Sequence, residues 1–384
     1  MSALSAMAII GIIYAAGDYV SHKTRAVCSM IFVSGIIFMV GFWVGLPKTL
    51  FQDSQLIPVA MAFISVLMVH MGSLMNLKEL VAQWKTVIIA LAAICAAAVA
   101  LYFLAAPIIG REYALAAAGP VSGGVVATLI MSEAAKAKGL EVISVFLTML
   151  LVLQNFVGIP IASWCLIREA RRLKASGAMP VEETSEAAAV RRLVPPLPKP
   201  LQTPNILMAI TFSVAWAAVK LAGLTGGVVH PFVMALLAGI LCRELGIVEP
   251  KVMDRANAGG LLLFVIMVPI FMSLDKATPA MVAHLIVPIV VAFAAAVAGI
   301  VAISWPMSRL TGQSMALTVA LGVPCLFGFP ATYIVAHEVA SEEGKTEEEK
   351  AMILSALLPK MLISGFVSVT IASVILAGFL VRFM

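Results

Sequence analysis

Long runs of apolar residues fill almost the whole sequence, and short polar loops separate them. An α-helix needs about 20 apolar residues to cross a bilayer, and several of these runs are that long. The composition agrees, since 62% of the residues are hydrophobic and only 12% are charged, whereas a soluble domain is about half apolar and a quarter charged. We therefore predict an all-α polytopic membrane protein. The apolar runs lie at 3–18, 27–46, 56–76, 86–108, 113–135, 141–167, 205–223, 228–242, 258–274, 281–304, 314–340 and 352–382.

Charged and sulfur-containing residues limit the classes of function. The net charge is +5, but the basic residues lie mostly in loops, where they set orientation in a membrane rather than bind nucleic acid. The five cysteines are scattered and no pair has metal-ligand spacing, so we interpret them as small core residues. Because no nucleotide-binding loop, metal cluster or catalytic triad spacing is found, we expect neither a primary pump nor an enzyme, and no cofactor.

Two of the apolar runs, 113–135 and 314–340, are interrupted by glycine and proline in similar ways. The pattern Gly124-x-x-Ala-Thr128 in the first matches Gly328-x-x-Ala-Thr332 in the second, 204 residues later. Non-helical backbone survives at membrane depth only where protein buries it or a wet cavity lines it. Paired broken segments in two halves are the best sequence pointer to a transporter binding site. The alternative is that these glycines only let helices pack closely.

Further matches along the chain support an internal repeat, whose detection decides the architecture. We predict a first transmembrane repeat at 1–167, a linker at 168–204 and a second repeat at 205–384. Each half would contain four helices, one broken element and a closing helix. The further matches are Ser73-Leu74 with Ser273-Leu274, Glu133 with Glu338, Gly139 with Gly344, and Gly158 with Gly365.

The charge of the linker predicts the orientation of the protein. Residues 168–199 contain seven basic and four acidic side chains, which places the linker in the cytoplasm. If both broken stretches are re-entrant, each half crosses the membrane five times, and this odd number inverts the second half relative to the first. Both termini then lie on the outer side of the inner membrane, and so do Lys136 and Lys138, against the trend. If the broken stretches cross fully, inversion is lost.

The layout resembles the sodium/glutamate symporters, within a wider group of inverted-repeat ion transporters that includes the 2-hydroxycarboxylate carriers. The residues that carry the resemblance are Ser122-Gly123-Gly124, Gly328-Phe-Pro-Ala-Thr332 and the helix end Met71–Asn76. The resemblance implies two five-helix halves, each with a glycine-rich re-entrant loop. Val125 and Val126 interrupt the denser Gly/His/Thr run of that family. The resemblance therefore favours a carboxylate carrier without specifying glutamate.

The broken stretches offer the groups that a carrier needs to replace the hydration shells of its cargo. Hydroxyls and backbone carbonyls suit sodium, and N–H groups at a half-helix N-terminus suit a carboxylate. Thr128 and Thr332 would bind, or would only cap their own helices. The candidate substrate- and ion-binding residues are Ser122, Gly123, Gly124, Thr128, Asn155, Gly328, Ala331, Thr332, Tyr333 and Lys360, with a candidate Na⁺ site at Thr128, Asn155 and Thr332.

Two polar positions inside apolar runs complete the prediction. Gln154 and Asn155 lie in the middle of the run 141–167, where Asn155 would coordinate an ion or bond a neighbouring helix. Lys360 lies inside the run 352–382, where an ionisable residue is a functional hypothesis by default. It would neutralise a carboxylate substrate, take a proton during transport, or extend to the interface.

The sequence thus predicts a secondary-active transporter of a small organic anion, such as glutamate or another carboxylate. We expect sodium as the coupling ion, alternating access as the mechanism, and a homodimer in the lipid bilayer. The alternative is a proton-coupled carrier or a cation/proton antiporter that uses Lys360. An intramembrane enzyme or a channel fits the sequence less well.

Overall fold

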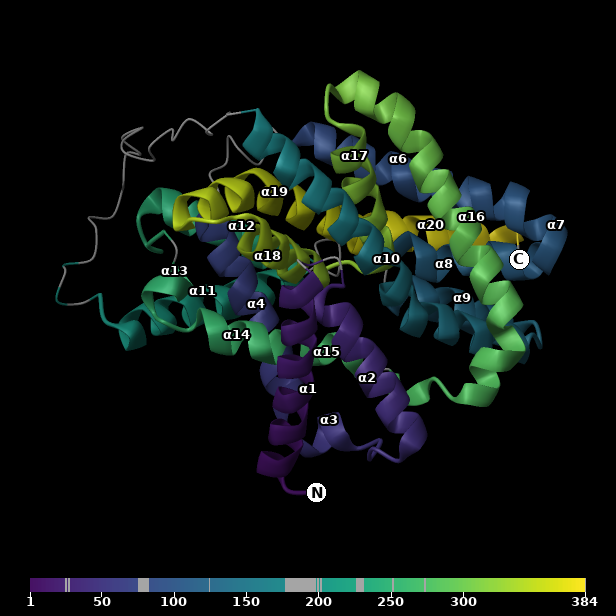
Figure 1. Cartoon of the computed structure of the whole chain (residues 1–384), viewed down its shortest axis with the longest axis horizontal. Coiled ribbons are helices and arrows are strands. Elements are labelled where there is room, and N and C mark those ends of the chain that lie inside the picture. The colour runs from purple at the N-terminus through teal and green to yellow at the C-terminus, as the bar shows by residue number, and fades with distance from the viewer. Residues whose placement is uncertain are drawn as a thin grey trace. The chain divides into compact units, whose positions relative to one another are not determined.

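The computed structural model is helical throughout, with no strand among the residues that it describes (Figure 1). It describes residues 1–384 except 25, 27, 75–82, 124, 177–197, 199, 201, 226–230, 251, 273 and 384. Eight helical segments in the described chain are long and apolar enough to cross a membrane. The prediction of an all-α, multi-pass membrane protein is confirmed at this level. These segments are Ala3–Thr24, Leu56–Ser73, Trp84–Ile109, Glu141–Ala175, Pro204–Leu224, Gly259–Lys276, Pro279–Thr311 and Glu347–Val367.

Packing divides the chain into two compact units, each built from segments that are far apart in the sequence. The smaller unit contains Met1–Ala3, Phe51–Trp84 and Pro180–Ile270. The larger unit contains Leu4–Leu50, Lys85–Met179 and Phe271–Met384. Both units therefore combine residues from the first and the second half of the sequence. The short helices α3 (Leu50–Asp53) and α15 (Val268–Phe271) lie where the chain passes from one unit to the other.

The smaller unit is a bundle in which α4 packs closely against α12. A Cβ atom added at Gly72 would overlap Leu236 O, and one added at Gly239 would overlap Val69 O. Small residues therefore let these two backbones approach. His70 Nδ1 accepts a hydrogen bond of 3.3 Å from Met253 N, which satisfies this buried imidazole. The helices are α4 (Leu56–Leu74), α11 (Pro204–Leu224), α12 (Pro231–Leu245), α13 (Val252–Arg255) and α14 (Gly259–Ile266).

The larger unit holds both of the broken stretches. Helix α6 continues through a π-helical segment into α7, and α19 continues through the π-helical segment η5 into α20. The helices are α1 (Ala3–Thr24), α2 (Met30–Val44), α6 (Trp84–Ala100), η1 (Leu101–Ala105), α7 (Ala106–Ile109), α8 (Arg111–Gly123), α9 (Val125–Ala137), α10 (Glu141–Ala175), η3 (Leu274–Lys276), α16 (Pro279–Thr311), α17 (Met315–Gly322), η4 (Val323–Leu326), α18 (Ala331–Glu343), α19 (Glu347–Val367), η5 (Ser368–Ala372), α20 (Ser373–Leu380) and η6 (Val381–Phe383).

Helix α10 is the longest element of the larger unit and contacts α8, α9, α17 and α18. Its 35 residues span about 52 Å. It ends at Ala175 rather than at the predicted residue 167, so the first residues of the predicted linker are helical. The reason is that 168–175 consists of good helix formers and that Glu169 pairs with Arg172 one turn later. Hydrophilic composition ends a membrane span without ending the helix.

Helices α6 and α16 run antiparallel beside each other. Lys85, at the start of α6, donates a hydrogen bond of 2.9 Å to the carbonyl of Thr311 at the end of α16. In the middle of the pair, a Cβ atom added at Gly299 would lie 2.5 Å from Ala96 O and 2.6 Å from Ala100 Cβ. The lysine thus satisfies a C-terminal carbonyl and complements the helix dipole.

Candidate solute and ion site

The first broken stretch forms a helical hairpin, α8–α9, whose base lies beside the start of α10. A Cβ atom added at Gly119 would lie 2.6 Å from Met131 Cγ, so the two arms run back to back. The Oγ atoms of Ser132 and Ser144 are 2.5 Å apart, which ties α9 to the first turns of α10. Gly123, at the end of α8, has a φ of +121° that glycine adopts readily.

The second broken stretch forms another hairpin, from α17 to α18, whose base lies beside the end of α10. Ser314 Oγ accepts from Leu317 N at 3.0 Å, which begins α17, and it also donates to the Glu169 carboxylate. At the end of α18, Glu343 Oε1 accepts two hydrogen bonds from Arg171, of 2.7 and 3.0 Å. Both ends of this hairpin are therefore held by the last turns of α10.

The two hairpins thus approach α10 from its opposite ends. Ser144 and Glu169, which mark the two bases, are separated along the α10 axis by about 38 Å. This separation is longer than either hairpin arm, so each hairpin reaches only part of the way along α10. Both predicted broken stretches are therefore hairpins within the larger unit. Their bends lie between the levels of Ser144 and Glu169 along α10.

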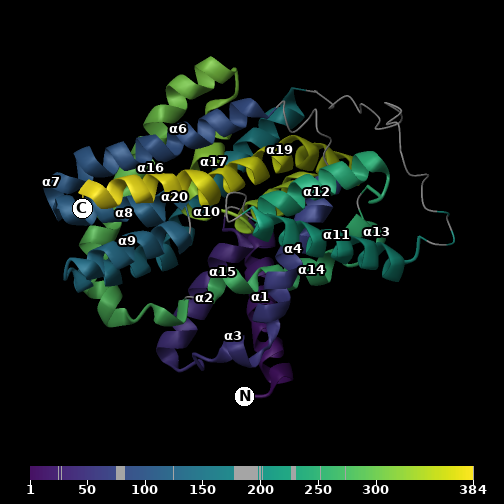
Figure 2. The same cartoon turned by 180° about the vertical axis from the view of Figure 1, so that it is seen from behind.

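The bends of both hairpins reach the same π-helical turn, η5. A Cβ atom added at Gly123 would lie 2.5 Å from Ser368 O, and one added at Gly328 would overlap Val369 Cγ1. Gly328 has a φ of +60° and precedes the cis peptide bond between Phe329 and Pro330. Figure 2 shows the continuation of this turn, α20, running alongside α8. Single π-helical turns in α-helices are frequent at functional sites.

Two further glycines bring α10 and α19 against the second bend. A Cβ atom added at Gly158 would lie 2.6 Å from the ring of Phe327. One added at Gly365 would lie 2.9 Å from Thr332 Oγ1. These are the two glycines that the repeat pairs with each other. In the structure they enclose the bend at Gly328 from two different helices.

Two buried side-chain oxygens near this bend have no hydrogen-bond partner among the described residues: Thr332 Oγ1 and Gln154 Oε1. Thr332 is 0% exposed and Gln154 is 5% exposed. Gln154 precedes Gly158 by four residues, so the two share one face of α10. A buried polar group without a partner costs about 1–3 kcal/mol. A ligand that binds both oxygens would remove this cost.

Thr332 does not cap its own helix, which rules out the alternative role considered from the sequence. Pro330 occupies the N-cap position of α18, and no side chain caps that end. The backbone N–H of Thr332 already bonds to Gly328 O at 3.1 Å. The Thr332 hydroxyl is therefore not used to terminate α18. Gln154 was not among the predicted site residues, although an amide in the middle of an apolar run is costly unless it bonds to protein or solute.

The other predicted residues of the first hairpin are mostly buried. Ser122 Oγ donates to Gly119 O at 2.9 Å within α8, so its oxygen remains an acceptor. Thr128 lies buried as the fourth residue of α9. Gly124 lies outside the described residues.

The remaining predicted residues lie in the second hairpin or in the helices beside it. Ala331 is the buried first residue of α18, and the buried Tyr333 ring packs on the His337 ring with centroids 4.2 Å apart. Asn155 is half-buried in α10. Lys360 is half-buried in α19, within electrostatic range of Glu169. It makes no hydrogen bond to any residue that the structure describes. Lys360 precedes by five residues Gly365, the residue of α19 that adjoins Thr332.

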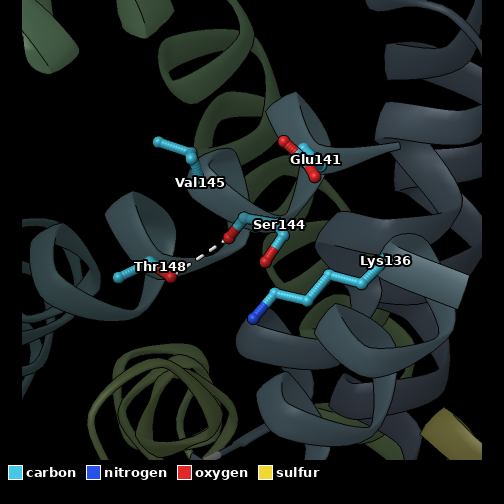
Figure 3. Close-up of a pocket in the computed structure, with 5 residues that line it drawn as sticks. All are labelled: Lys136, Glu141, Ser144, Val145 and Thr148. Carbon is cyan, nitrogen blue, oxygen red and sulfur yellow. Dashed lines mark hydrogen bonds between the residues drawn. The ribbon is translucent and has the colours of Figure 1, made fainter. Parts of the chain in front are cut away.

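A groove of about 360 Å³ opens beside the start of α10 (Figure 3). Exposed Lys136 and Glu141 line it together with the hydroxyls of Ser144 and Thr148. Thr148 Oγ1 donates to Ser144 O at 3.1 Å, the dashed line in Figure 3. Ser144, Thr148 and Asn155 are four and seven residues apart, so they share one face of α10, with Leu151 and Val152 between the last two. We call these three residues the polar stripe. The stripe leads from this groove toward the level of Gln154.

Comparisons with known proteins give this chain no family: no family model matches it, and no curated protein matches it either. Among the described residues, no group of three or more His, Cys, Asp or Glu side chains is placed to hold a metal ion. Function is therefore inferred from the two hairpins and the polar atoms around their bends.

Proposed function

We propose that this protein is a secondary-active transporter that carries a small organic anion, such as glutamate or another carboxylate, by alternating access. The observation that carries the proposal is the meeting of two broken hairpins at one π-helical turn, after they approach from opposite ends of α10. Secondary transporters bind their cargo near the membrane midplane at such discontinuous helices. There, irregular backbone replaces the hydration shell of the solute.

The order of elements supports an inverted relation between the halves 1–167 and 205–384. Helix α6, the first hairpin and α10 follow one another in the first half, and α16, the second hairpin and α19 follow one another in the second. Helices α6 and α16 are antiparallel, and the hairpins have their bases at opposite ends of α10. A twofold axis in the membrane plane that relates the two halves would produce both relations. This inversion, as in the sodium/glutamate symporters, is part of the proposal.

Sodium is the proposed coupling ion because Thr332 Oγ1 and Gln154 Oε1, two buried atoms without a partner among the described residues, are neutral oxygens. Thr332 lies beside the bend at Gly328, and Gln154 lies one helical turn from Gly158, which packs on Phe327 of that bend. Backbone carbonyls at the ends of broken helices coordinate sodium in transporters of this kind. We propose that Thr332 and Gln154 supply the side-chain ligands, with Asn155 and Thr128 as further candidates.

The carboxylate of the solute would bind at the N-terminus of α18, where the positive end of the helix dipole favours an anion. Ala331 begins this helix directly after the bend. The solute would reach it along the polar stripe of α10, from the groove at Lys136 past Thr148 and Asn155. Lys136 would attract the anion to that groove.

A proton-coupled carrier or cation/proton antiporter that uses Lys360 is the second candidate. The observation that favours it is the half-buried ammonium of Lys360, which has no hydrogen-bond partner in the described part of the chain. Buried lysines exchange protons readily. This candidate uses the same hairpins but a different coupling ion, so transport assays with separate ion gradients distinguish the two.

The proposed orientation places the linker 168–204 in the cytoplasm and both termini on the outer side of an inner membrane. It follows from the basic excess of the linker. Residues 1 and 384 would then share a compartment because each half crosses five times. The proposal includes a homodimer as the functional assembly.

Uptake by proteoliposomes tests the proposed function. Purified protein is reconstituted, and labelled glutamate, other amino acids and dicarboxylates are supplied under an inward sodium gradient or an inward proton gradient, each alone. We expect accumulation of at least one carboxylate under the sodium gradient. Accumulation driven only by the proton gradient would favour the Lys360 carrier, and equilibration without accumulation under either gradient would show a passive channel.

A further inference from the structure

Toward its C-terminus, each of three membrane-spanning helices of the larger unit carries a basic group over an aromatic ring. Arg168 lies over the Trp164 ring at 3.7 Å, and Arg309 lies over the Trp305 ring at 4.7 Å. The third pair, Lys23 over Tyr19 at 5.0 Å, closes α1 in the same way. In each pair the basic residue follows the aromatic residue by four positions, which is one helical turn.

All three rings face outward, where the surroundings of a membrane protein are lipid. Tyr19, Trp164 and Trp305 are 61%, 49% and 58% exposed. Apolar aromatic bodies with one polar edge are enriched where the hydrocarbon of a bilayer meets its headgroups. The cations that follow them are exposed as well. We call these six residues the basic–aromatic belt: Tyr19, Lys23, Trp164, Arg168, Trp305 and Arg309.

Hydrogen bonds within the larger unit place the three helix ends together at the end of α10 that leads into the linker. His22 contacts Glu342 at 3.0 Å, which ties the end of α1 to α18. The adjacent Glu343 binds Arg171 of α10. Helix α16 ends at Thr311, just before the serine that bonds α17 to α10. The belt therefore lies at one end of the unit, which we call the linker end.

The belt cations differ from the other basic residues around them. Arg171, Arg172 and Lys174 each pair with a carboxylate. In the part of the chain that the structure describes, the three belt cations make no ion pair and no hydrogen bond. Their charge is thus left for a group outside the protein. The ring beneath each cation restricts its position, and no carboxylate of the described residues occupies its N–H groups.

We propose that the basic–aromatic belt binds the phosphate groups of anionic phospholipids in the leaflet at the linker end. Each ring would lie at headgroup depth, and each cation would reach the phosphate layer above it. The guanidinium groups of Arg168 and Arg309 match phosphate in a two-pronged geometry. At the opposite end, the described residues show one cation–ring contact, Arg111 over Tyr102, at a longer 5.8 Å. The proposal is independent of the transported solute.

Lipid binding to the full chain in neutral detergent micelles tests this inference. Phosphatidylglycerol or phosphatidylcholine is added, bound lipids are counted by native mass spectrometry, and the thermal unfolding midpoint is followed. We expect a preference for phosphatidylglycerol that falls by about fivefold for each belt cation replaced. The variant is Lys23→Gln/Arg168→Gln/Arg309→Gln.

The matched control removes three positive charges at the other end: Lys48→Gln/Lys138→Gln/Lys276→Gln. These lysines are exposed, and the control should keep the preference for phosphatidylglycerol. The charge-preserving variant Arg168→Lys/Arg309→Lys should keep most of it. Equal binding of both lipids by the unaltered protein, or an undiminished preference in the belt variant, would overturn the proposal. So would equal stabilisation by inorganic phosphate, because the ligand would then be a free anion.

Discussion

Glu338 Oε1 accepts a hydrogen bond from the backbone N–H of Met30 at 2.5 Å, so a carboxylate from the second hairpin caps the first residue of α2. Ser29 occupies the N-cap position of α2 but does not cap it with its own side chain. Instead, Ser29 Oγ donates to Glu338 Oε2 at 2.7 Å, and Ser21 Oγ donates to Oε1. The carboxylate thus connects α18 to the turn between α1 and α2.

Replacing Glu338 by alanine should destabilise the protein. The change removes a charged acceptor and leaves the Met30 N–H and the buried hydroxyls of Ser21 and Ser29 without it. Hydrogen bonds to charged groups contribute about 1.5–3 kcal/mol each, but removing the carboxylate also removes the cost of burying it, so we expect a net loss of about 3 kcal/mol. Thermal unfolding in micelles measures it. The control Glu348→Ala, at an exposed position of α19, should change the midpoint little, and equal midpoints for the two variants would contradict the capping role.

Replacing Gly328 by alanine should strongly reduce transport while the protein still inserts. The new Cβ would overlap Val369 Cγ1 at the π-helical turn, and a φ of +60° is unfavourable for alanine. Both effects displace the bend from the position where we propose that the ion binds. Uptake in proteoliposomes, normalised to inserted protein, is the measurement.

The double variant Gly328→Ala/Val369→Ala separates the two effects. Without Cγ1, the nearest atom of residue 369 to the new methyl group is Cβ, at an ordinary contact distance of 3.5 Å. Only the backbone strain then remains, at about 1–2 kcal/mol. We therefore expect partial recovery of uptake. Gly378→Ala serves as the control because no atom lies within 4 Å of its added Cβ.

The sequence predicted both hairpins because glycine and proline mark them directly. The runs 113–135 and 314–340 correspond to α8–α9 and to α17–α18 within a few residues. The π-helical turn at Ser368–Ala372 was not predicted. Its sequence has no glycine or proline, and its irregularity coincides with contacts from two distant bends. Local patterns do not contain such contacts.

The candidate site was predicted in part for a similar reason. Thr332 and Gly328 belong to a motif that occurs twice, so the sequence identified them. The difference between Gln154 and Asn155 depends on which face of α10 meets the second bend. That face is set by Gly158 against Phe327, a pair of residues far apart in the chain. The uninterrupted helix to Ala175 was not predicted, because charged residues end an apolar run without breaking a helix.

Replacing Lys360 by glutamine distinguishes the two coupling hypotheses. If sodium drives transport, the variant should retain sodium-dependent accumulation, with at most a weaker apparent affinity for the anion, because the lysine is only half-buried beside the hairpin. If protons drive transport, accumulation under a proton gradient should disappear. Uptake is compared under each gradient alone, with Lys350→Gln as a surface control that removes an ammonium paired with Glu347 at 2.8 Å.

Single cysteines should report the orientation of the larger unit. In a cysteine-free background, Ser176→Cys lies just beyond α10, and Lys138→Cys lies in the turn before it. Because these positions are at opposite ends of one helix, an impermeant thiol reagent added to intact cells should label only residue 138. Labelling of residue 176 alone would reverse the proposed orientation. Labelling of both would show that α10 does not separate two compartments.

Sodium should stabilise the protein through Thr332. Its Oγ1 is buried without a partner among the described residues, so Thr332→Val removes a ligand while preserving side-chain shape. Without sodium, the variant should be at least as stable as the unaltered protein, because no hydrogen bond is lost and a desolvated hydroxyl is removed. With sodium at 100 times its Kd, the unaltered protein should gain about 2.7 kcal/mol, and the variant should gain much less. Thermal unfolding at matched ionic strength, with choline in place of sodium, measures both terms.

The control is Thr318→Val, because Thr318 is equally buried but donates a hydrogen bond of 2.8 Å to Ser314 O within α17. It should lose about 1 kcal/mol in either salt and keep the sodium-dependent gain. The two variants should therefore behave in opposite ways. Without sodium only Thr318→Val should lose stability, and with sodium only Thr332→Val should lose most of the gain. If Thr332→Val is destabilised without sodium and keeps the full gain with it, the hydroxyl is a structural group and the ion binds elsewhere.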